Sequence, residues 1–127
     1  MKKKTISVLL IDPSTQTITP IEIEKGIEAI YKAMDCEIFE CPIEYANGDV
    51  LYCDEEHKLN RSKLIGGFTY PNAWNDVIMN KALVIGTSPN GDSTNCKSKP
   101  SDIQNMDGGI QWYDKASCES VLQFMGF

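Results

Sequence analysis

The sequence predicts an α+β fold: a mostly antiparallel β-sheet built from hairpins, one main amphipathic helix and a short C-terminal helix. Two β-branched, apolar runs lie either side of a turn within residues 5–23, which is typical of a hairpin. Residues 24–34 then repeat apolar side chains at helical spacing, and a further apolar run occupies residues 82–85. Strands joined by short turns, with few helices among them, favour an antiparallel sheet.

The first hairpin begins with a strand over residues 5–11, and the unbroken apolar stretch Val8–Ile11 predicts that this strand is central. Asp12-Pro13-Ser14-Thr15 has the composition of a turn. Pro20 cannot donate a ladder hydrogen bond, so the returning strand is expected at the edge of the sheet. Its apolar residues are Ile18, Ile21 and Ile23.

The main helix is predicted over residues 24–34, where apolar residues recur at i, i+3, i+4 and i+7. Gly26 weakens the first turn, so the helix is free to begin later. The apolar residues are Ile27, Ile30, Tyr31 and Met34.

A second hairpin is predicted around Asn47-Gly48, which separates the extended segment 36–45 from the run 49–53. Asparagine and glycine both tolerate positive φ, so this pair indicates a type I′ turn.

The second half of the chain has weaker signals. Asn72 is a candidate cap for a short helix through Met79, and residues 82–85 form a buried strand. Residues 111–113 are expected to form a short strand, and Ser117 to cap a final helix. That helix carries Val121, Leu122, Phe124 and Met125.

The length of 127 residues fits one domain, so a single α+β domain is expected over residues 1–127. Within it, residues 87–109 are polar and include Pro89-Asn90-Gly91-Asp92. We therefore predict a long polar loop there, of the kind that is flexible or functional.

The formal net charge of −6 comes from the first 60 residues, which hold twelve acids and six bases. An acidic surface repels phosphate backbones, so direct nucleic-acid binding is not expected. The same surface suits either ordinary solubility or a basic partner.

Five cysteines form an odd set without the close pairs that structural zinc requires, so neither a disulfide framework nor a metal is expected. The apolar run after the N-terminal lysines ends at Ile11, which is too short for a secretory signal or for the about 20 residues of a membrane span. We therefore expect a cytoplasmic protein with no membrane contact. The cysteines are Cys36, Cys41, Cys53, Cys96 and Cys118.

Catalysis is not indicated by the residues. His57 is the single histidine and stands among acids, with neither a nucleophile nor an orienting partner nearby in sequence. The glycines match no phosphate-binding or dinucleotide-binding pattern. We expect a protein that is not an enzyme and that has no cofactor.

Aromatic residues mark the candidate binding positions, since aromatics and arginine are enriched at interface hot spots and also stack on nucleobases. Packing in the core is the alternative for each aromatic residue. Two groups stand out, one after Arg61 and Lys63 and the other near residue 112. The candidate residues are Arg61, Lys63, Phe68, Tyr70, Trp74, Trp112 and Tyr113.

Several short motifs occur in a fixed order: Val8-Leu9-Leu10-Ile11-Asp12-Pro13, the helix around residues 27–34, Asp49-Val50-Leu51-Tyr52 and Ala82-Leu83-Val84-Ile85-Gly86. Over residues 5–86 this order resembles a phage- and plasmid-encoded family of small proteins of unknown function, domain of unknown function family 3846.

The resemblance implies a phage accessory protein acting in the cytoplasm of a host cell. The first expectation is a binding protein that inhibits a host protein of anti-phage defence through a protein–protein interface. The alternative is a sponge that binds a small nucleotide signal through Arg61 or Lys63 and a nearby aromatic residue. A second copy of the chain could also cover the edge strand that contains Pro20, giving a homo-oligomer.

Overall fold

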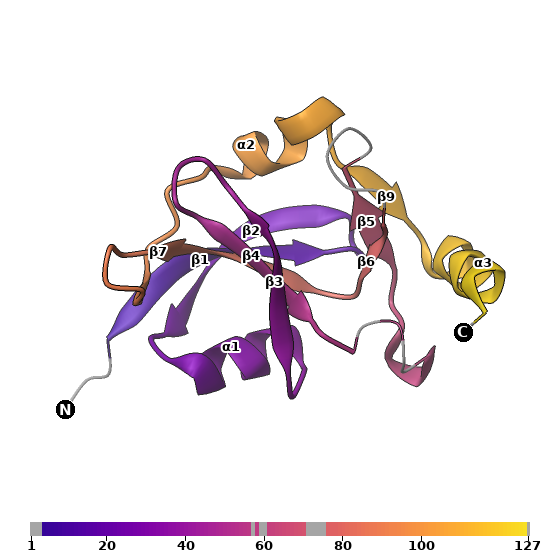
Figure 1. Cartoon of the computed structure of the whole chain (residues 1–127), viewed down its shortest axis with the longest axis horizontal. Coiled ribbons are helices and arrows are strands. Elements are labelled where there is room, and N and C mark those ends of the chain that lie inside the picture. Colours follow the sequence, from indigo (N-terminus) through magenta and orange to yellow (C-terminus); the bar gives the residue numbers. More distant parts are fainter. Residues whose placement is uncertain (1–3, 57, 59–60, 71–75, 127) are drawn as a thin grey trace.

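The computed structural model describes residues 4–56, 58, 61–70 and 76–126, and it has the predicted α+β architecture with antiparallel sheets (Figure 1). In chain order the elements are β1 (Thr5–Asp12), β2 (Thr17–Glu24), α1 (Ile27–Met34), β3 (Phe39–Glu44), β4 (Val50–Asp54), the 3₁₀ helix η1 (Arg61–Lys63), β5 (Gly67–Thr69), β6 (Ile78–Met79), β7 (Ala82–Thr87), β8 (Ser93–Thr94), α2 (Pro100–Asn105), the 3₁₀ helix η2 (Met106–Gly108), β9 (Gln111–Tyr113) and α3 (Lys115–Met125).

The larger sheet has the strand order β2-β1-β7-β4-β3, with β8 added to β7. Every pair in this order is antiparallel, as predicted. β1 and β7 are interior strands, and their apolar runs are buried on both faces. β2 lies at the edge, in agreement with the position of Pro20.

Successive side chains of the interior strands point to two different cores, because side chains alternate across a sheet. Val8 and Leu83 pack on the face covered by α1, whereas Leu9 and Val84 pack on the opposite face. α2 and the smaller sheet lie over that opposite face (Figure 1).

The smaller sheet has the order β6-β5-β9 and supports α3 at one end of the molecule (Figure 1). Cys118 and Leu122 of α3 are buried against Leu64, Val77 and Met79. Because residues 118 and 122 are four apart, they lie on one face of the helix.

Helix α1 is confirmed, but it begins at Ile27 because β2 continues through Glu24. Gly26 precedes it with φ 136°, a conformation that side-chain-bearing residues rarely adopt. Ile30 and Met34 face the core, whereas Ile27 is 55% exposed.

Two predictions about helices are wrong. The described residues of the expected helix through Met79 include strand β6 at Ile78–Met79, and its candidate cap Asn72 lies outside the described residues. The final helix is capped by Asp114, whose carboxylate accepts a hydrogen bond from the Ser117 amide at 2.7 Å. Ser117 is thus the donor of this cap and not the capping residue. Phe124, at 93% exposed, does not join the buried face.

The turn of the β3–β4 hairpin differs from the predicted type I′ turn. Gly48 has φ 91°, but Asn47 is not among the residues with positive φ. The Tyr45 amide bonds to the Asp49 carbonyl oxygen at 2.8 Å, which leaves a three-residue loop. The Asn47 side chain accepts a hydrogen bond from the Asp49 amide at 3.0 Å, so asparagine stabilises the turn with its side chain and not with a left-handed backbone.

The segment 87–109, predicted as a long polar loop, contains β8, α2 and η2. Pro100 is the first residue of α2, where its missing N–H and fixed φ suit a helix start. The Asp102 carboxylate accepts a hydrogen bond from the Lys99 amide at 2.8 Å and completes this start. Polar composition alone did not reveal the helix.

Candidate functional site

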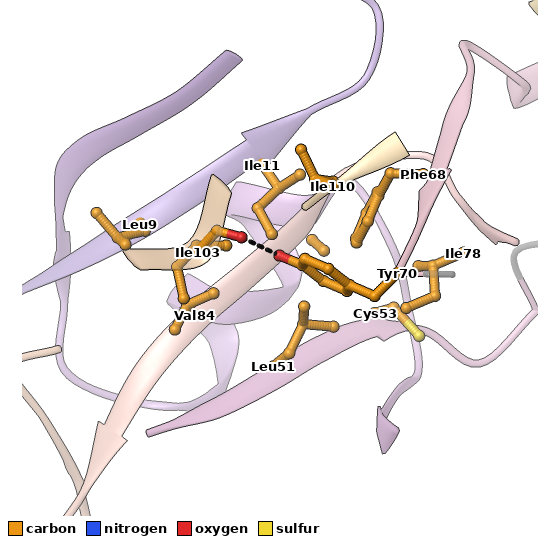
Figure 2. Packing of buried hydrophobic residues seen from close by; sticks show 11 residues of the cluster. Leu9, Ile11, Leu51, Cys53, Phe68, Tyr70, Ile78, Val84, Ile103 and Ile110 are labelled. Carbon is orange, nitrogen blue, oxygen red and sulfur yellow. Dashed lines mark hydrogen bonds between the residues drawn. The ribbon is translucent and has the colours of Figure 1, made fainter. Parts of the chain in front are cut away.

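Phe68 and Tyr70 were predicted as contact residues, but both are fully buried. Their rings meet edge to face at 6.3 Å, and the Tyr70 hydroxyl donates a hydrogen bond to the Ile103 carbonyl oxygen at 2.6 Å (Figure 2). Burial raises the pKa of this hydroxyl. The prediction of a contact surface at these two residues is therefore wrong, because the larger sheet and α2 enclose them.

The other predicted positions are dispersed. Trp112 lies beside Phe68 on the neighbouring strand, with ring centroids 6.2 Å apart, and is half-buried. Tyr113 is half-buried against the core under α3. Trp74 lies outside the described residues, as does the Arg61 side chain. The structure thus joins Trp112 to the core around Phe68.

Lys63 is exposed and lines a small pocket of about 110 Å³ at the end of α1. Asp35 and Asp54 line the same pocket, and Glu37 and Glu56 line an adjoining one of about 200 Å³. The lining residues that the structure describes include no aromatic ring, and carboxylates surround the lysine. This pocket is poorly suited to a nucleotide, since like charges repel phosphate.

Three aromatic rings that sequence analysis did not select gather on the α1 side of the larger sheet. Tyr31 and Phe39 have ring centroids 5.2 Å apart, and Phe39 and Tyr52 have centroids 4.6 Å apart. All three side chains are half-buried, and the adjacent Ile38 is 44% exposed. We call Tyr31, Ile38, Phe39 and Tyr52 the aromatic corner.

Each ring is positioned by a different element. Tyr31 follows Ile27 by one helical turn, so both lie on one side of α1. Phe39 is the first residue of β3 and pairs with Asp54 at the end of β4. Tyr52 faces α1 because its neighbours Leu51 and Cys53 point into the opposite core. The alternation of residues 51–53 was visible in the sequence, but the alignment of the hairpin with α1 was not.

Partial burial and charge distinguish this corner from the core. Burial, and then the nearby Cys41, raise the pKa of Tyr52, so its hydroxyl stays neutral and able to donate. Glu37 and Glu40 flank Ile38 and Phe39 in sequence and are exposed. The Glu40 carboxylate lies on the opposite face of the hairpin, where it accepts a hydrogen bond from the Cys53 thiol at 3.7 Å. The corner is therefore a partly exposed aromatic surface with Glu37 next to it in the chain.

The cysteines are free thiols, and burial raises the pKa of every one. Cys36, with a pKa of about 11, is also next to Asp54 and Asp35, which disfavour a thiolate. A protonated thiol is a weak nucleophile and a weak metal ligand. Within the described residues, no group of three or more histidine, cysteine, aspartate or glutamate side chains could hold a metal.

The fold and this surface define an α+β protein with antiparallel sheets and a partly exposed aromatic cluster. The chain belongs to a family with a domain of unknown function, DUF3846, whose model matches residues 5–106. The match confirms the family resemblance and extends it past residue 86 to the end of α2. No curated protein and no solved structure matches the chain. None of the helices in the described ranges is long and apolar enough to cross a membrane.

Proposed function

We propose that this chain is a non-enzymatic binding protein that contacts another protein through the aromatic corner. The observation that carries this proposal is the row of three touching, half-buried rings beside the exposed Ile38. Rigid aromatic side chains supply large contact areas at low entropic cost, which is why they dominate hot spots. Ring contacts of this kind also hold the surface in place before binding, since each is worth about 0.5–1.5 kcal/mol.

The partner is a host protein, and binding inhibits it; a protein of anti-phage defence in the bacterial cytoplasm is the partner that the expected phage origin implies. The exposed Glu37, two residues before Phe39, supports a partner with a basic surface, because complementary charge speeds encounter and selects the partner.

A nucleotide sponge has weaker support. The pocket at Lys63 places Asp35, Glu37, Asp54 and Glu56 around a single exposed ammonium group of η1, with Lys81 also in the lining. With four carboxylates and two ammonium groups around it, the pocket does not favour binding of a phosphate group. A thermal-shift panel of nucleotides tests the alternative, since a ligand that binds only the native state raises the melting temperature.

The proposal is tested by native mass spectrometry of tagged protein recovered from a bacterial lysate. The wild type should carry a discrete protein partner, and Ile38→Asp should lose it, because the substitution puts a charge directly next to Phe39 at an exposed position. Ile38 is exposed enough that the fold tolerates this change. Phe124→Asp is the matched control, since Phe124 is exposed on α3. A partner that remains on Ile38→Asp, or a small-mass adduct in place of a protein, would contradict the proposal.

A further inference from the structure

A groove runs between the edge strand β2 and helix α1, with a volume of about 560 Å³. Its apolar lining consists of Ile21 and Ile23 from β2 and Ala29 and Ala33 from α1. Glu28 and Lys32 of α1 are polar residues of the lining, and Glu22 and Glu24 of β2 also line the groove, between and beside the two isoleucines.

The backbone of β2 can be divided into groups that face β1 and groups that face outward. The Lys25 amide donates to the Lys4 carbonyl oxygen at 2.8 Å, so Lys25 faces β1. In an antiparallel pair, alternate residues make the ladder bonds, and Ile23 and Ile21 therefore also face β1. The N–H and C=O of Glu22 consequently point to the outer edge.

Two further observations agree with this division. Pro20 falls on the outward series, where its missing N–H costs the β1–β2 ladder nothing. On β1, Ser7 belongs to the series that faces away from β2, and its amide and carbonyl are both bonded to residues 95 and 96.

The opposite edge of the larger sheet is less suited to pairing. β3 has a register shift between Glu40 and Ile43, with Pro42 inside it. Bulges protect edges from added strands, as do prolines whose missing N–H faces outward. β2, in contrast, keeps one register with β1 over its full length from Thr17 to Glu24. Pro20 of β2 is a proline whose missing N–H faces outward, so an added strand can pair with β2 only at residues 21–24.

We propose that the outer edge of β2 receives an extended segment of the partner protein in which apolar and basic side chains alternate. This inference rests on the proposed function, and it adds a second contact region and the chemistry of the segment. Ile21 and Ile23 point to the α1 side, so apolar residues of an added strand lie beside them in the groove. Glu22 and Glu24 point to the other side, where lysine or arginine of the added strand lies next to them. Opposite charges in such cross-strand pairs are favourable.

The charge of β2 selects this occupant over a second copy of the chain. If two β2 strands paired, the carboxylates of Glu22 and Glu24 would meet those of the other copy. Like charges directly opposite each other destabilise a sheet. The same reasoning excludes an acidic segment.

The inference is tested by titrating the ¹⁵N-labelled full chain with an eight-residue peptide of alternating valine and lysine, and with a matched peptide of valine and glutamate. The amide signals of residues 21–24 and 29–33 should shift with the lysine peptide, at an affinity at least about tenfold above that of the glutamate peptide. Equal affinities, shifts confined to other residues, or no shifts at millimolar peptide would overturn the inference. A dimer in the free protein, seen by light scattering and abolished by Glu22→Pro, would show that a second copy occupies β2 and would overturn the inference.

Two variants at one position separate the backbone contribution from the charge contribution. Glu22→Pro removes the outward N–H and leaves the β1 ladder intact, so the fold should persist and binding should weaken about tenfold. Glu22→Gln keeps the N–H and should weaken binding less. Unchanged binding by Glu22→Pro would overturn strand addition. Ile38→Asp should bind the lysine peptide as the wild type does, so failure of the aromatic corner and failure of the β2 edge are distinguishable.

Discussion

Ser98 donates two hydrogen bonds to the Asp49 carboxylate, from its amide at 2.8 Å and from its hydroxyl at 2.6 Å. The Lys97 amide donates to both carboxylate oxygens at 3.1 Å, and the Cys96 thiol approaches one of them at 3.2 Å. Asp49 is fully buried, yet these donors satisfy its charge. The carboxylate therefore holds residues 96–98 against the start of β4 through hydrogen bonds, and it positions the segment that leads into α2.

Replacing Asp49 with asparagine should lower the free energy of unfolding by about 3 kcal/mol. The amide has only one acceptor oxygen for the donors that the carboxylate now satisfies, and each buried donor left without a partner costs about 1–3 kcal/mol. Urea unfolding followed by circular dichroism measures the loss. Asp92→Asn, at an exposed turn, is the control and should change stability by less than about 0.5 kcal/mol. A loss for Asp49→Asn as small as this would contradict the assigned role.

Stability should fall in acid through this same carboxylate. Burial tends to raise the pKa of Asp49, but the hydrogen bonds from Ser98, Lys97 and Cys96 outweigh it and hold the pKa below its ordinary value. A carboxylate with a lowered folded-state pKa stabilises the fold above its unfolded-state pKa of about 3.9 and loses this contribution as pH falls through the folded-state value.

Unfolding free energies measured in urea between pH 7 and pH 3 should therefore decline below about pH 4. Asp114 at the cap of α3 also has a lowered pKa and contributes to the same decline. The comparison with Asp49→Asn isolates the first group, since this variant should show a shallower decline. Parallel curves for the two proteins would show that Asp49 does not contribute.

The placement of Phe68 in the core predicts that Phe68→Ala costs about 3–5 kcal/mol of stability, the range for a large buried aromatic. Phe124→Ala removes the same atoms from a side chain that is 93% exposed and should change stability by less than about 0.5 kcal/mol. Thermal and urea unfolding compare the two directly. Similar costs for both variants would contradict the described burial.

Hydrophobic patterns within a short stretch of sequence were sufficient to predict those strands and helices whose own residues show which face is buried. β1 and β7 are apolar on both faces, and α1 has a clear helical period, so their type was evident from the sequence. β6 was predicted as helix because its two residues owe their strand pairing to Gly67 and Phe68 of β5. Such pairing depends on tertiary contacts that a short window does not contain.

The candidate site was harder to predict because it is built from distant segments. The sequence predicted a contact surface at Phe68 and Tyr70, but in the fold both side chains pack in the core together with Ile103 of α2. Tyr31, Phe39 and Tyr52 are far apart in the sequence, so their contact in the fold could not be predicted from it. The regular structure within residues 87–109 could not be predicted for the same reason. It is held by a hydrogen bond between Ser98 and Asp49, which are separated by 49 positions in the sequence.

The most direct test of the proposed interface is the affinity of the purified partner, once it has been recovered with the wild-type chain, for Phe39→Ala measured by calorimetry. Phe39 touches both tyrosines, so its loss should weaken binding at least about tenfold, as for a hot-spot residue. Phe124→Ala should bind as the wild type does, and circular dichroism should show that both variants are folded. An affinity for Phe39→Ala within about twofold of the wild type, in a folded protein, would contradict the claim that the aromatic corner binds the partner.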